Sequence, residues 1–171
     1  GNWGFIKVSN TGNVEMSYAQ MRYGGSNTTN MAILYLSDNA KATLDHATVS
    51  HSLRNGIQLD SGAAASTTRL TFTNGDITSN SGIGIYAATS GGIGQLYVAD
   101  SRIESNGSYG IYSVPSNTAM AENNWWGSDS GPEPYGSGNG INYRQCHDNV
   151  TKTYYICQYY VDADPWIGKQ G

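Results

Sequence analysis

Apolar and small residues recur along the chain in one fixed spacing: apolar, any residue, apolar, two residues, small, any residue, apolar. The copies are Val14-Met16-Ala19-Met21, Ala42-Leu44-Ala47-Val49, Leu70-Phe72-Gly75-Ile77, Leu96-Val98-Ser101-Ile103 and, with polar Thr118 in the first slot, Thr118-Met120-Asn123-Trp125. The second apolar positions, from Met16 to Met120, are separated by 28, 28, 26 and 22 residues. A period of this length predicts stacked supersecondary units.

Each copy predicts two short strands joined by a bend. Apolar residues two positions apart place one face of a strand inward. The bend between the strands combines a small residue with a residue before it that tolerates left-handed backbone geometry or is polar. The residues before the small position are Tyr18, His46, Asn74, Asp100 and Glu122. We expect them to stack, one per turn, along one corner of the fold.

A third strand follows in most units. Gly56-Ile57, Gly84-Ile85 and Gly110-Ile111 each begin seven residues after the preceding apolar anchor, and Ile33-x-Tyr35 takes this place in the first unit. Three strands per turn predict an all-β coil that climbs about 4.8 Å per turn, with five to six turns. The competing architecture is an antiparallel sandwich with Asn-Gly hairpins, but most Asn-Gly pairs fall at differing places in the repeat, which favours the coil.

The end of the chain differs from the repeats and predicts a cap. We expect residues 1–127 to form the coil and residues 128–171 a loop and hairpin packed on its last turn. Trp125 occupies an inward position of the fifth copy, and Trp126 and Trp166 add apolar surface to cover the open end. No comparable cap precedes Trp3, so either more chain precedes Gly1 or another subunit covers that edge.

Composition narrows the setting of the protein. Only 13% of the residues are charged, the net charge is −4, and Gly and Tyr number 22 and 13. This composition favours strands and turns over helices, and it lacks the basic patch that nucleic-acid binding requires. No apolar run approaches the length of a membrane-spanning helix, and no signal peptide is visible.

Two cysteines and three sequons point to an extracellular location. Cys146 and Cys157 are expected to pair in an oxidising compartment; two buried thiols in a reducing compartment are the alternative. Asn27, Asn106 and Asn149 each begin an Asn-x-Ser/Thr sequon, which is a glycan acceptor only where the source organism glycosylates.

The whole pattern resembles the right-handed parallel β-helix proteins of the pectate-lyase-like superfamily, above all the secreted and cell-surface proteins of bacteria and archaea. The similar segments are Trp3-Gly4-x-Ile6, Met21 to Gly25, Asn123-Asn124-Trp125-Trp126-Gly127, Ser130-Gly131-Pro132 and Asp164-Pro165-Trp166-Ile167. The stretch from Gln145 to Tyr160, with both cysteines, departs from the family. The resemblance implies either a structural module or a polysaccharide-cleaving enzyme.

Candidate catalytic groups are few. Asp100 and Glu122, on adjacent turns, have the spacing of a retaining glycosidase pair, but the bend itself accounts for such residues. Lyases of the resembled family use a cluster of acidic Ca²⁺ ligands and a basic residue, whereas the arginines here share no register.

Candidate metal ligands are equally sparse. Cys146-His147-Asp148 with Cys157 matches no zinc spacing, and a disulfide is the better interpretation. Asp129, Asp162 and Asp164 offer oxygen ligands for Ca²⁺, although ordinary loop acids explain them equally well. We therefore expect no cofactor, with Ca²⁺ as the alternative.

Tyrosines are the remaining candidates for binding. Tyr86, Tyr97, Tyr109 and Tyr112 alternate with inward residues and are expected to point outward. Outward tyrosines either stack on sugar rings or partner chains, or reflect the general preference of strands for Tyr. The leading hypothesis is a non-catalytic extracellular scaffold for adhesion, glycan binding or self-assembly through the first turn. A polysaccharide lyase or glycoside hydrolase is the alternative.

Overall fold

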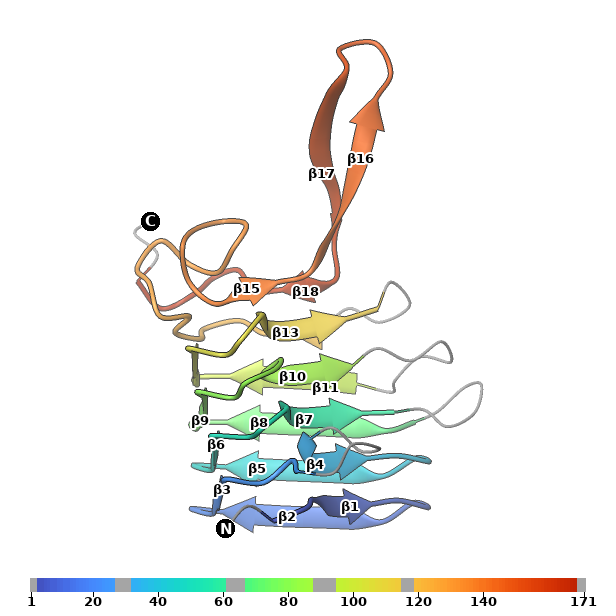
Figure 1. The fold of residues 1–171 in the computed structure, drawn as a ribbon, viewed down its shortest axis with the longest axis vertical. Coiled ribbons are helices and arrows are strands. Elements are labelled where there is room, and N and C mark those ends of the chain that lie inside the picture. The colour runs from blue at the N-terminus through green and yellow to red at the C-terminus, as the bar shows by residue number, and fades with distance from the viewer. Residues whose placement is uncertain (1–2, 27–31, 61–66, 88–94, 115–118, 169–171) are drawn as a thin grey trace.

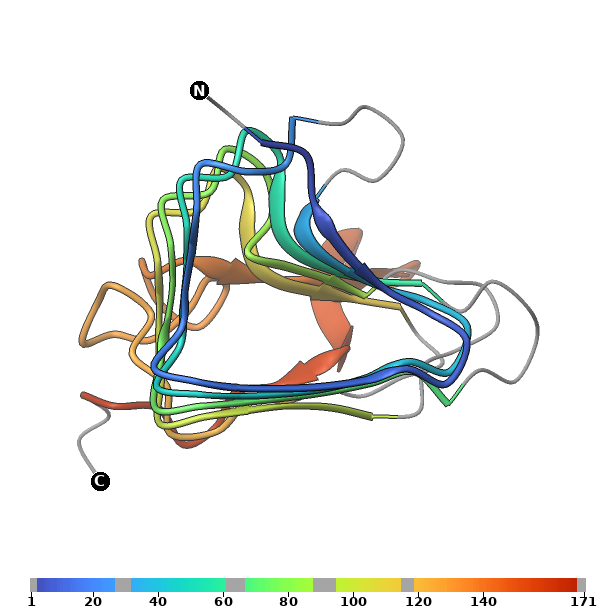
Figure 2. The same ribbon diagram turned by 90° about the horizontal axis from the view of Figure 1, so that it is seen from below.

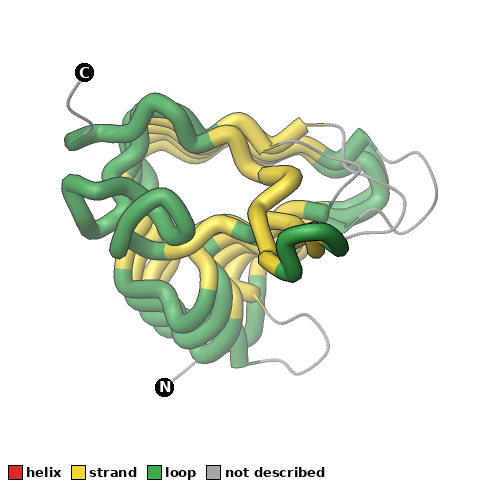
Figure 3. Tube along the Cα trace, turned by 90° about the horizontal axis from the view of Figure 1, so that it is seen from above, coloured by secondary structure: helices red, strands yellow, loops and turns green. Residues whose placement is uncertain are grey.

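The computed structural model describes residues 3–26, 32–60, 67–87, 95–114 and 119–168. These residues form strands, turns and bends, with no helix among them (Figure 3). The backbone winds as a coil whose turns lie above one another along the long axis, from β1 to β13 (Figure 1). The all-β class expected from the repeat is confirmed.

Three parallel sheets form the walls of the coil. In spatial order, sheet A contains β1 (Ile6–Val8), β4 (Ala32–Leu36), β7 (Asn55–Leu59), β10 (Ile85–Ala87), β13 (Tyr109–Ser113) and β15 (Gly140–Ile141). Sheet B contains β2 (Asn13–Ser17), β5 (Lys41–Asp45), β8 (Arg69–Thr73), β11 (Gln95–Ala99), β14 (Ala119–Met120) and β18 (Val161–Asp162). Sheet C contains β3 (Gln20–Arg22), β6 (Thr48–Ser50), β9 (Asp76–Thr78) and β12 (Arg102–Glu104).

The coil has about four complete turns, slightly fewer than the five to six expected. Each of these turns contributes one strand to each sheet, from β1–β3 to β10–β12. A fifth turn retains β13, β14 and a single bridge between Arg102 and Trp125. Above it, β15 and β18 extend sheets A and B by one strand each.

Equivalent residues of successive turns pair directly, which stacks apolar side chains inside the coil. Leu44 pairs with Phe72, and Phe72 with Val98. All three are fully buried, as are the third-strand residues Ile57 and Ile85. Burying each such side chain contributes about 1.5–3 kcal/mol, so the repeated apolar positions supply the core that the sequence predicted.

The fifth copy of the repeat is shifted by one residue from the predicted register. Met120 pairs with outward Tyr97 and is 37% exposed. The inward positions are instead filled by Ala119, Ala121, Asn124 and Trp126, all of them buried. Trp126, rather than Trp125, therefore enters the core. Its ring lies where a side chain at Gly110 would point. Thr118 lies outside the described residues.

The buried side chain of Asn124 explains this shift. Its Nδ2 donates hydrogen bonds to the carbonyl oxygens of Ala121 (2.7 Å) and Val98 (2.8 Å). Its Oδ1 accepts a hydrogen bond from the backbone N–H of Ser101 at 2.9 Å. A buried amide with these three partners satisfies backbone groups at the bend, and this compensates for placing two alanines where larger residues were expected.

Left-handed residues form the predicted corner between sheets B and C. Tyr18, His46, Asn74 and Asp100 have φ angles of 56°, 51°, 54° and 52°. Because of the shifted register, the fifth left-handed residue is Asn123, with φ of 58°, and not Glu122. The expected corner column is therefore confirmed for four residues and wrong for the fifth.

A ladder of asparagines satisfies the backbone at the next bend, after sheet C. Asn80 Nδ2 donates to Asn106 Oδ1 at 2.9 Å, and Asn106 Nδ2 donates to Asn139 Oδ1 at 2.8 Å. Each amide also donates to a backbone carbonyl, Asn80 to Val49 and Asn106 to Ile77. The ladder links successive turns through groups that would otherwise be buried without partners.

The segment after residue 127 covers the last turn in part and projects from it in part. Trp166 packs against Gly131, and its Nε1 donates to the carbonyl oxygen of Asp129 at 3.3 Å. The antiparallel hairpin of β16 (Tyr143–Asp148) and β17 (Thr153–Tyr159) rises away from the coil rather than folding over it (Figure 1). The cap is thus made of the loops around β15 and β18, with the hairpin as a projecting arm.

The disulfide between Cys146 and Cys157 stays a prediction, and the hairpin places the two residues on adjacent strands. Cys146 pairs with Tyr155 in the ladder, and Cys157 lies in β17 beside the β-bulge opposite Arg144 and Gln145. We expect alkylation without reductant to leave the intact mass unchanged, and alkylation after reduction to add two labels. Two labels added without reductant would contradict the pairing.

Removing the central amide of the asparagine ladder should destabilise the coil. Asn106→Ala leaves Asn80 Nδ2, Asn139 Oδ1 and the Ile77 carbonyl without the partner that each has now. We expect the free energy of unfolding to fall by about 3 kcal/mol, measured by denaturant titration. The matched control is Asn13→Ala, whose exposed amide donates to the nearby Glu15 carboxylate. An equal effect of both substitutions would refute the role of the ladder.

Candidate functional site

The outer face of sheet A holds one column of polar and aromatic side chains. The pairing register places Lys7, Tyr35, Gln58, Tyr86 and Tyr112 on successive turns, one above the other. The strands of this sheet bend inward, so that its outer face is concave in the view along the coil axis (Figure 2). At about 4.8 Å per turn the column is about 19 Å long.

The upper part of the column is aromatic. The rings of Tyr86 and Tyr112 are stacked with centroids 5.6 Å apart, and the Tyr109 ring meets that of Tyr112 edge-on at 5.4 Å. The structure thus brings together three of the four predicted outward tyrosines. The fourth, Tyr97, lies on β11 in sheet B and belongs to a different wall of the coil.

The lower part of the column is a hydrogen-bonding cluster. The Tyr35 hydroxyl donates to Asp60 Oδ2 at 2.7 Å, and the Lys7 ammonium lies 5.7 Å from the Tyr35 ring centroid. Burial, and next the bond to Asp60, raise the pKa of the Tyr35 hydroxyl well above its usual range, so this hydroxyl stays a donor. Sequence analysis missed Lys7, Tyr35 and Gln58 as candidates, although the third-strand register already aligned Gln58 with Tyr86.

Gln58 joins the two parts. Its Oε1 is buried and has no hydrogen-bond partner among the described residues. A buried amide oxygen without a partner carries a penalty of about 1–3 kcal/mol, and because this atom is covered, the oxygen itself is not a contact point for a bound molecule. The column therefore offers hydroxyl and amide groups beside aromatic edges, the combination that recognises polyhydroxylated ligands.

The predicted carboxylate pair is not assembled as expected. Asp100 lies at the left-handed corner, and the residue at the same corner one turn above it is Asn123. Glu122 precedes this corner, and both carboxylates lie on the exposed surface. The shifted register therefore removes the stacked arrangement from which a glycosidase pair was inferred.

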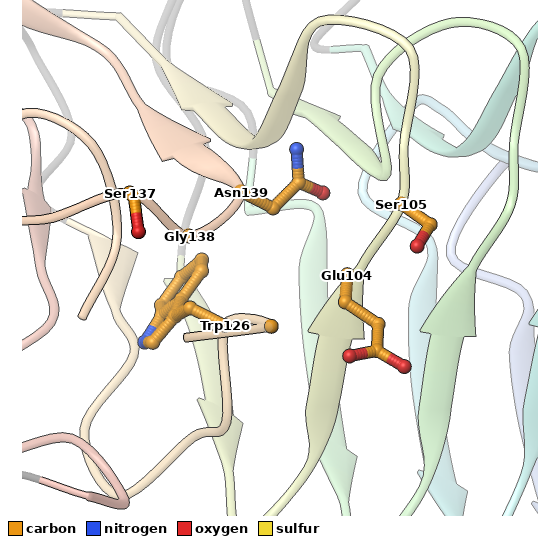
Figure 4. Close-up of a pocket in the computed structure, with 7 residues that line it drawn as sticks. Glu104, Ser105, Trp126, Ser137, Gly138 and Asn139 are labelled. Atoms are coloured by element: carbon orange, nitrogen blue, oxygen red, sulfur yellow. The ribbon is translucent and has the colours of Figure 1, made fainter. Parts of the chain in front are cut away.

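A polar hollow of about 300 Å³ lies where sheet C ends beneath the cap (Figure 4). It is lined by Glu104, Ser105, Trp126, Gly127, Ser137, Gly138 and Asn139. Glu104 is the one titratable residue of this lining, and its carboxylate accepts a hydrogen bond from Trp125 Nε1 at 2.9 Å and lies 3.3 Å from Arg102. Because both carboxylate oxygens have partners and no second acid lines the hollow, it lacks the pair that glycoside hydrolysis uses.

No metal-binding group emerges from the described residues. They contain no cluster of three or more His, Cys, Asp or Glu side chains that would hold an ion. Asp129, Asp162 and Asp164 are all described and do not form such a cluster. In the same part of the chain, no helix is long and apolar enough to cross a membrane.

The sequons have different surroundings. Asn106 is 8% exposed, and its Nδ2, the atom that would carry a glycan, donates two hydrogen bonds inside the ladder. Glycosylation at Asn106 is therefore incompatible with this packing. Asn149 lies exposed at the tip of the hairpin, where an acceptor is accessible. Asn27 lies outside the described residues.

A second polar cluster lies on the corner between sheets B and C. The Asp45 carboxylate accepts hydrogen bonds from Asn74 Nδ2 at 2.8 Å and Thr73 Oγ1 at 3.0 Å, and it lies 2.9 Å from His46 Nδ1. The His46 ring stacks on Tyr18 with centroids 4.7 Å apart. Because the bonds from Asn74 and Thr73 reach Asp45 from the next turn, the cluster cross-links two turns at the corner, and we call it the corner clip.

Comparison with known proteins supports the architecture. A family model described as the right-handed beta helix region matches residues 3–126. This range spans the three-sheet coil and ends at the buried Trp126. No curated protein and no solved structure matches the chain.

The corner cluster should be visible in the titration of Asp45. Its hydrogen bonds, that from Asn74 first, lower the pKa of the carboxyl from 3.8 to about 2. Because the folded pKa is lower than the unfolded one, the clip contributes stability above pH 4 and loses it as the pH falls toward 2. We expect Asn74→Gly, which keeps the left-handed backbone accessible, to raise this pKa toward 3.8, as followed by carboxyl-carbon NMR. Asn123→Gly at the equivalent corner is the control, and an unchanged Asp45 pKa in Asn74→Gly would contradict the assignment.

Proposed function

The chain belongs to the right-handed β-helix family, and from that premise we propose that it is a non-catalytic extracellular scaffold that binds glycans along sheet A. A coil of parallel strands is rigid because every interior strand is paired on both sides. Such a body presents outward residues at fixed spacing, which suits an adhesive or structural module at a cell surface. The net charge of −4 argues for a partner other than nucleic acid.

The observation that carries the proposal is the column from Lys7 to Tyr112. It places hydroxyl, amide and aromatic groups on one concave face. The spacing between these groups is about 4.8 Å per turn, close to the length of one sugar unit in a polysaccharide chain. The half-buried Gln58 lies at the centre of the column, between Tyr35 and Tyr86. The Asp60 carboxylate and the Lys7 ammonium both lie beside Tyr35 and offset each other, so the column has no excess positive charge to attract uronic acids and a neutral glycan is the expected ligand.

The stacked rings limit how the glycan contacts the column. Tyr86 and Tyr112 use one ring face each on the other, and Tyr109 packs by its edge. Their hydroxyls and outer edges thus make the contacts, together with Gln58. We expect recognition by hydrogen bonds along the coil axis, with modest affinity and little selectivity for the ends of the glycan.

Self-association and display at the cell surface belong to the same proposal. In the described chain β1, β2 and β3 each lie at the end of their sheet with one paired neighbour. Unpaired strand edges are templates for further pairing. Docking of a second copy or of another β-helix segment on these edges stays a prediction, as does the extracellular location.

Glycan binding should depend on the sheet A tyrosines. We expect wild-type protein to be retarded by xylan or laminarin in affinity electrophoresis, and less so by polygalacturonate. Tyr86→Ala and Tyr112→Ala should each weaken retention by about three- to tenfold, since stacking and hydrogen-bonding contacts of an exposed tyrosine contribute about 0.5–1.5 kcal/mol. Gln58→Leu should weaken it similarly, because it removes the amide group from the centre of the column and keeps the volume.

The matched control is Tyr97→Ala, which removes an outward tyrosine from sheet B that is more exposed than Tyr86 and Tyr112. Unchanged retention in this variant, with loss in the sheet A variants, supports the assigned face. Equal loss in all variants, or no retention by any of the three polysaccharides, would refute it. Release of unsaturated products or new reducing ends during the incubation would favour the alternative, a polysaccharide lyase or glycoside hydrolase.

A further inference from the structure

A second hollow lies at the base of the projecting hairpin, on residues that the sheet A column does not use. Tyr135, Tyr159, Val161 and Asp162 line this cavity of about 300 Å³. Tyr159 ends β17, Val161 and Asp162 form β18, and Tyr135 lies in the loop that precedes β15. Two separate stretches of the cap, the loop before β15 and the end of the hairpin with β18, therefore converge here.

The aromatic wall of this hollow is continuous. The rings of Tyr135 and Tyr159 stack with centroids 4.7 Å apart and an interplanar angle of 18°. The Trp166 ring follows at 5.5 Å from Tyr135, and Trp166 is itself fixed against Gly131. Because both neighbours restrain Tyr135, this wall is rigid before any ligand arrives, which reduces the entropy lost on binding.

The hollow is also electronegative. Asp162 lies in its lining and is exposed, and its Oδ1 accepts a long hydrogen bond of 3.4 Å from the backbone N–H of Asp164. Burial first, and then the charges of Tyr159, Asp162 and Asp164, together raise the pKa of Tyr135 to about 12. Both carboxylates therefore lie close enough to the Tyr135 hydroxyl to act on it.

The ligand must match both the aromatic wall and the negative charge. Aromatic rings attract cations through their quadrupole, and they also pack against the C–H faces of sugar rings. A neutral sugar would use the wall alone, and an acidic sugar would be repelled by Asp162. A volume of about 300 Å³ is at the lower end of ligand pockets and suits a single pyranose unit.

We propose that the Tyr135–Tyr159–Asp162 hollow binds a protonated amino-sugar unit, with the sugar ring against the outer edges of the two stacked tyrosines and the ammonium group at the Asp162 carboxylate. The site lies on the cap, apart from the outer face of sheet A, and it does not depend on glycan binding there. The bound unit would belong to a glycan with free amino groups, so the cap would recognise a glycan class different from the one expected at sheet A.

The test compares glucosamine trisaccharide with its fully N-acetylated form by NMR titration of ¹⁵N-labelled protein at constant salt. We expect the free amine to bind about tenfold more tightly, with shifts confined to Tyr135, Tyr159, Val161 and Asp162. Asp162→Asn, which keeps the shape and removes the charge, should abolish this preference. Equal affinity for both trisaccharides, or no binding of the amine, would overturn the proposal.

The matched control is Asp100→Asn, which removes an exposed carboxylate at a left-handed corner that Asn tolerates well. It should leave the tenfold preference intact, and an equal loss in both variants would reduce the effect to overall charge and refute the site. Free lysine serves as a competitor. If lysine displaces the trisaccharide at the concentration at which glucosamine does, the sugar ring makes no contribution and the amino-sugar assignment is wrong. Thermal melting of each variant verifies that the fold is retained.

Discussion

Direct pairing of equivalent residues between turns is the constraint on which the rest of this structure depends. Parallel backbone hydrogen bonds at a spacing of about 4.8 Å force each side chain onto the one above it. Leu44, Phe72 and Val98 thereby become one interior column, and Asn80, Asn106 and Asn139 become a ladder of amides. A residue that suits its own turn must also suit the turns on either side of it.

The same constraint sets the chemistry of the exterior. It stacks Tyr86 on Tyr112 and aligns both with Gln58 and Tyr35, so the outer face repeats along the axis as a polysaccharide does. It also tends to place like groups beside one another, and for carboxylates this is unfavourable without a cation. At the corner the structure avoids the problem by placing Asn123, and not Glu122, above Asp100. The pairing of equivalent residues therefore spaces the groups on each wall regularly along the axis.

The parts of the fold that repeat were predictable from the sequence, because periodic apolar residues report directly on what faces inward. The corner residues from Tyr18 to Asp100 followed from the same period. The fifth copy was predicted in the wrong register, because Met120 and Trp125 are more apolar than Ala121 and Asn124 in a simple pattern. What decides that turn is the hydrogen bonding of the Asn124 amide, which a hydrophobic pattern does not record. Tyr35 and Gln58 were missed because their significance lies in burial and in partners from other turns.

Where the repetition ends, side chains from unrelated segments can converge, and this is the reason that the cap is chemically different from the coil. Trp126 takes the inward position of the fifth copy and lies against Gly110, and β15 and β18 pair with the last strands. The chain after the fifth copy follows no period, so Tyr135, Tyr159 and Trp166 meet from three places in the sequence. Convergence of this kind is what a hollow with an aromatic wall and a carboxylate requires. In this fold the regular walls make the coil long and rigid. Side chains of the cap are not held in the register between turns, so they can converge around a single chemical group.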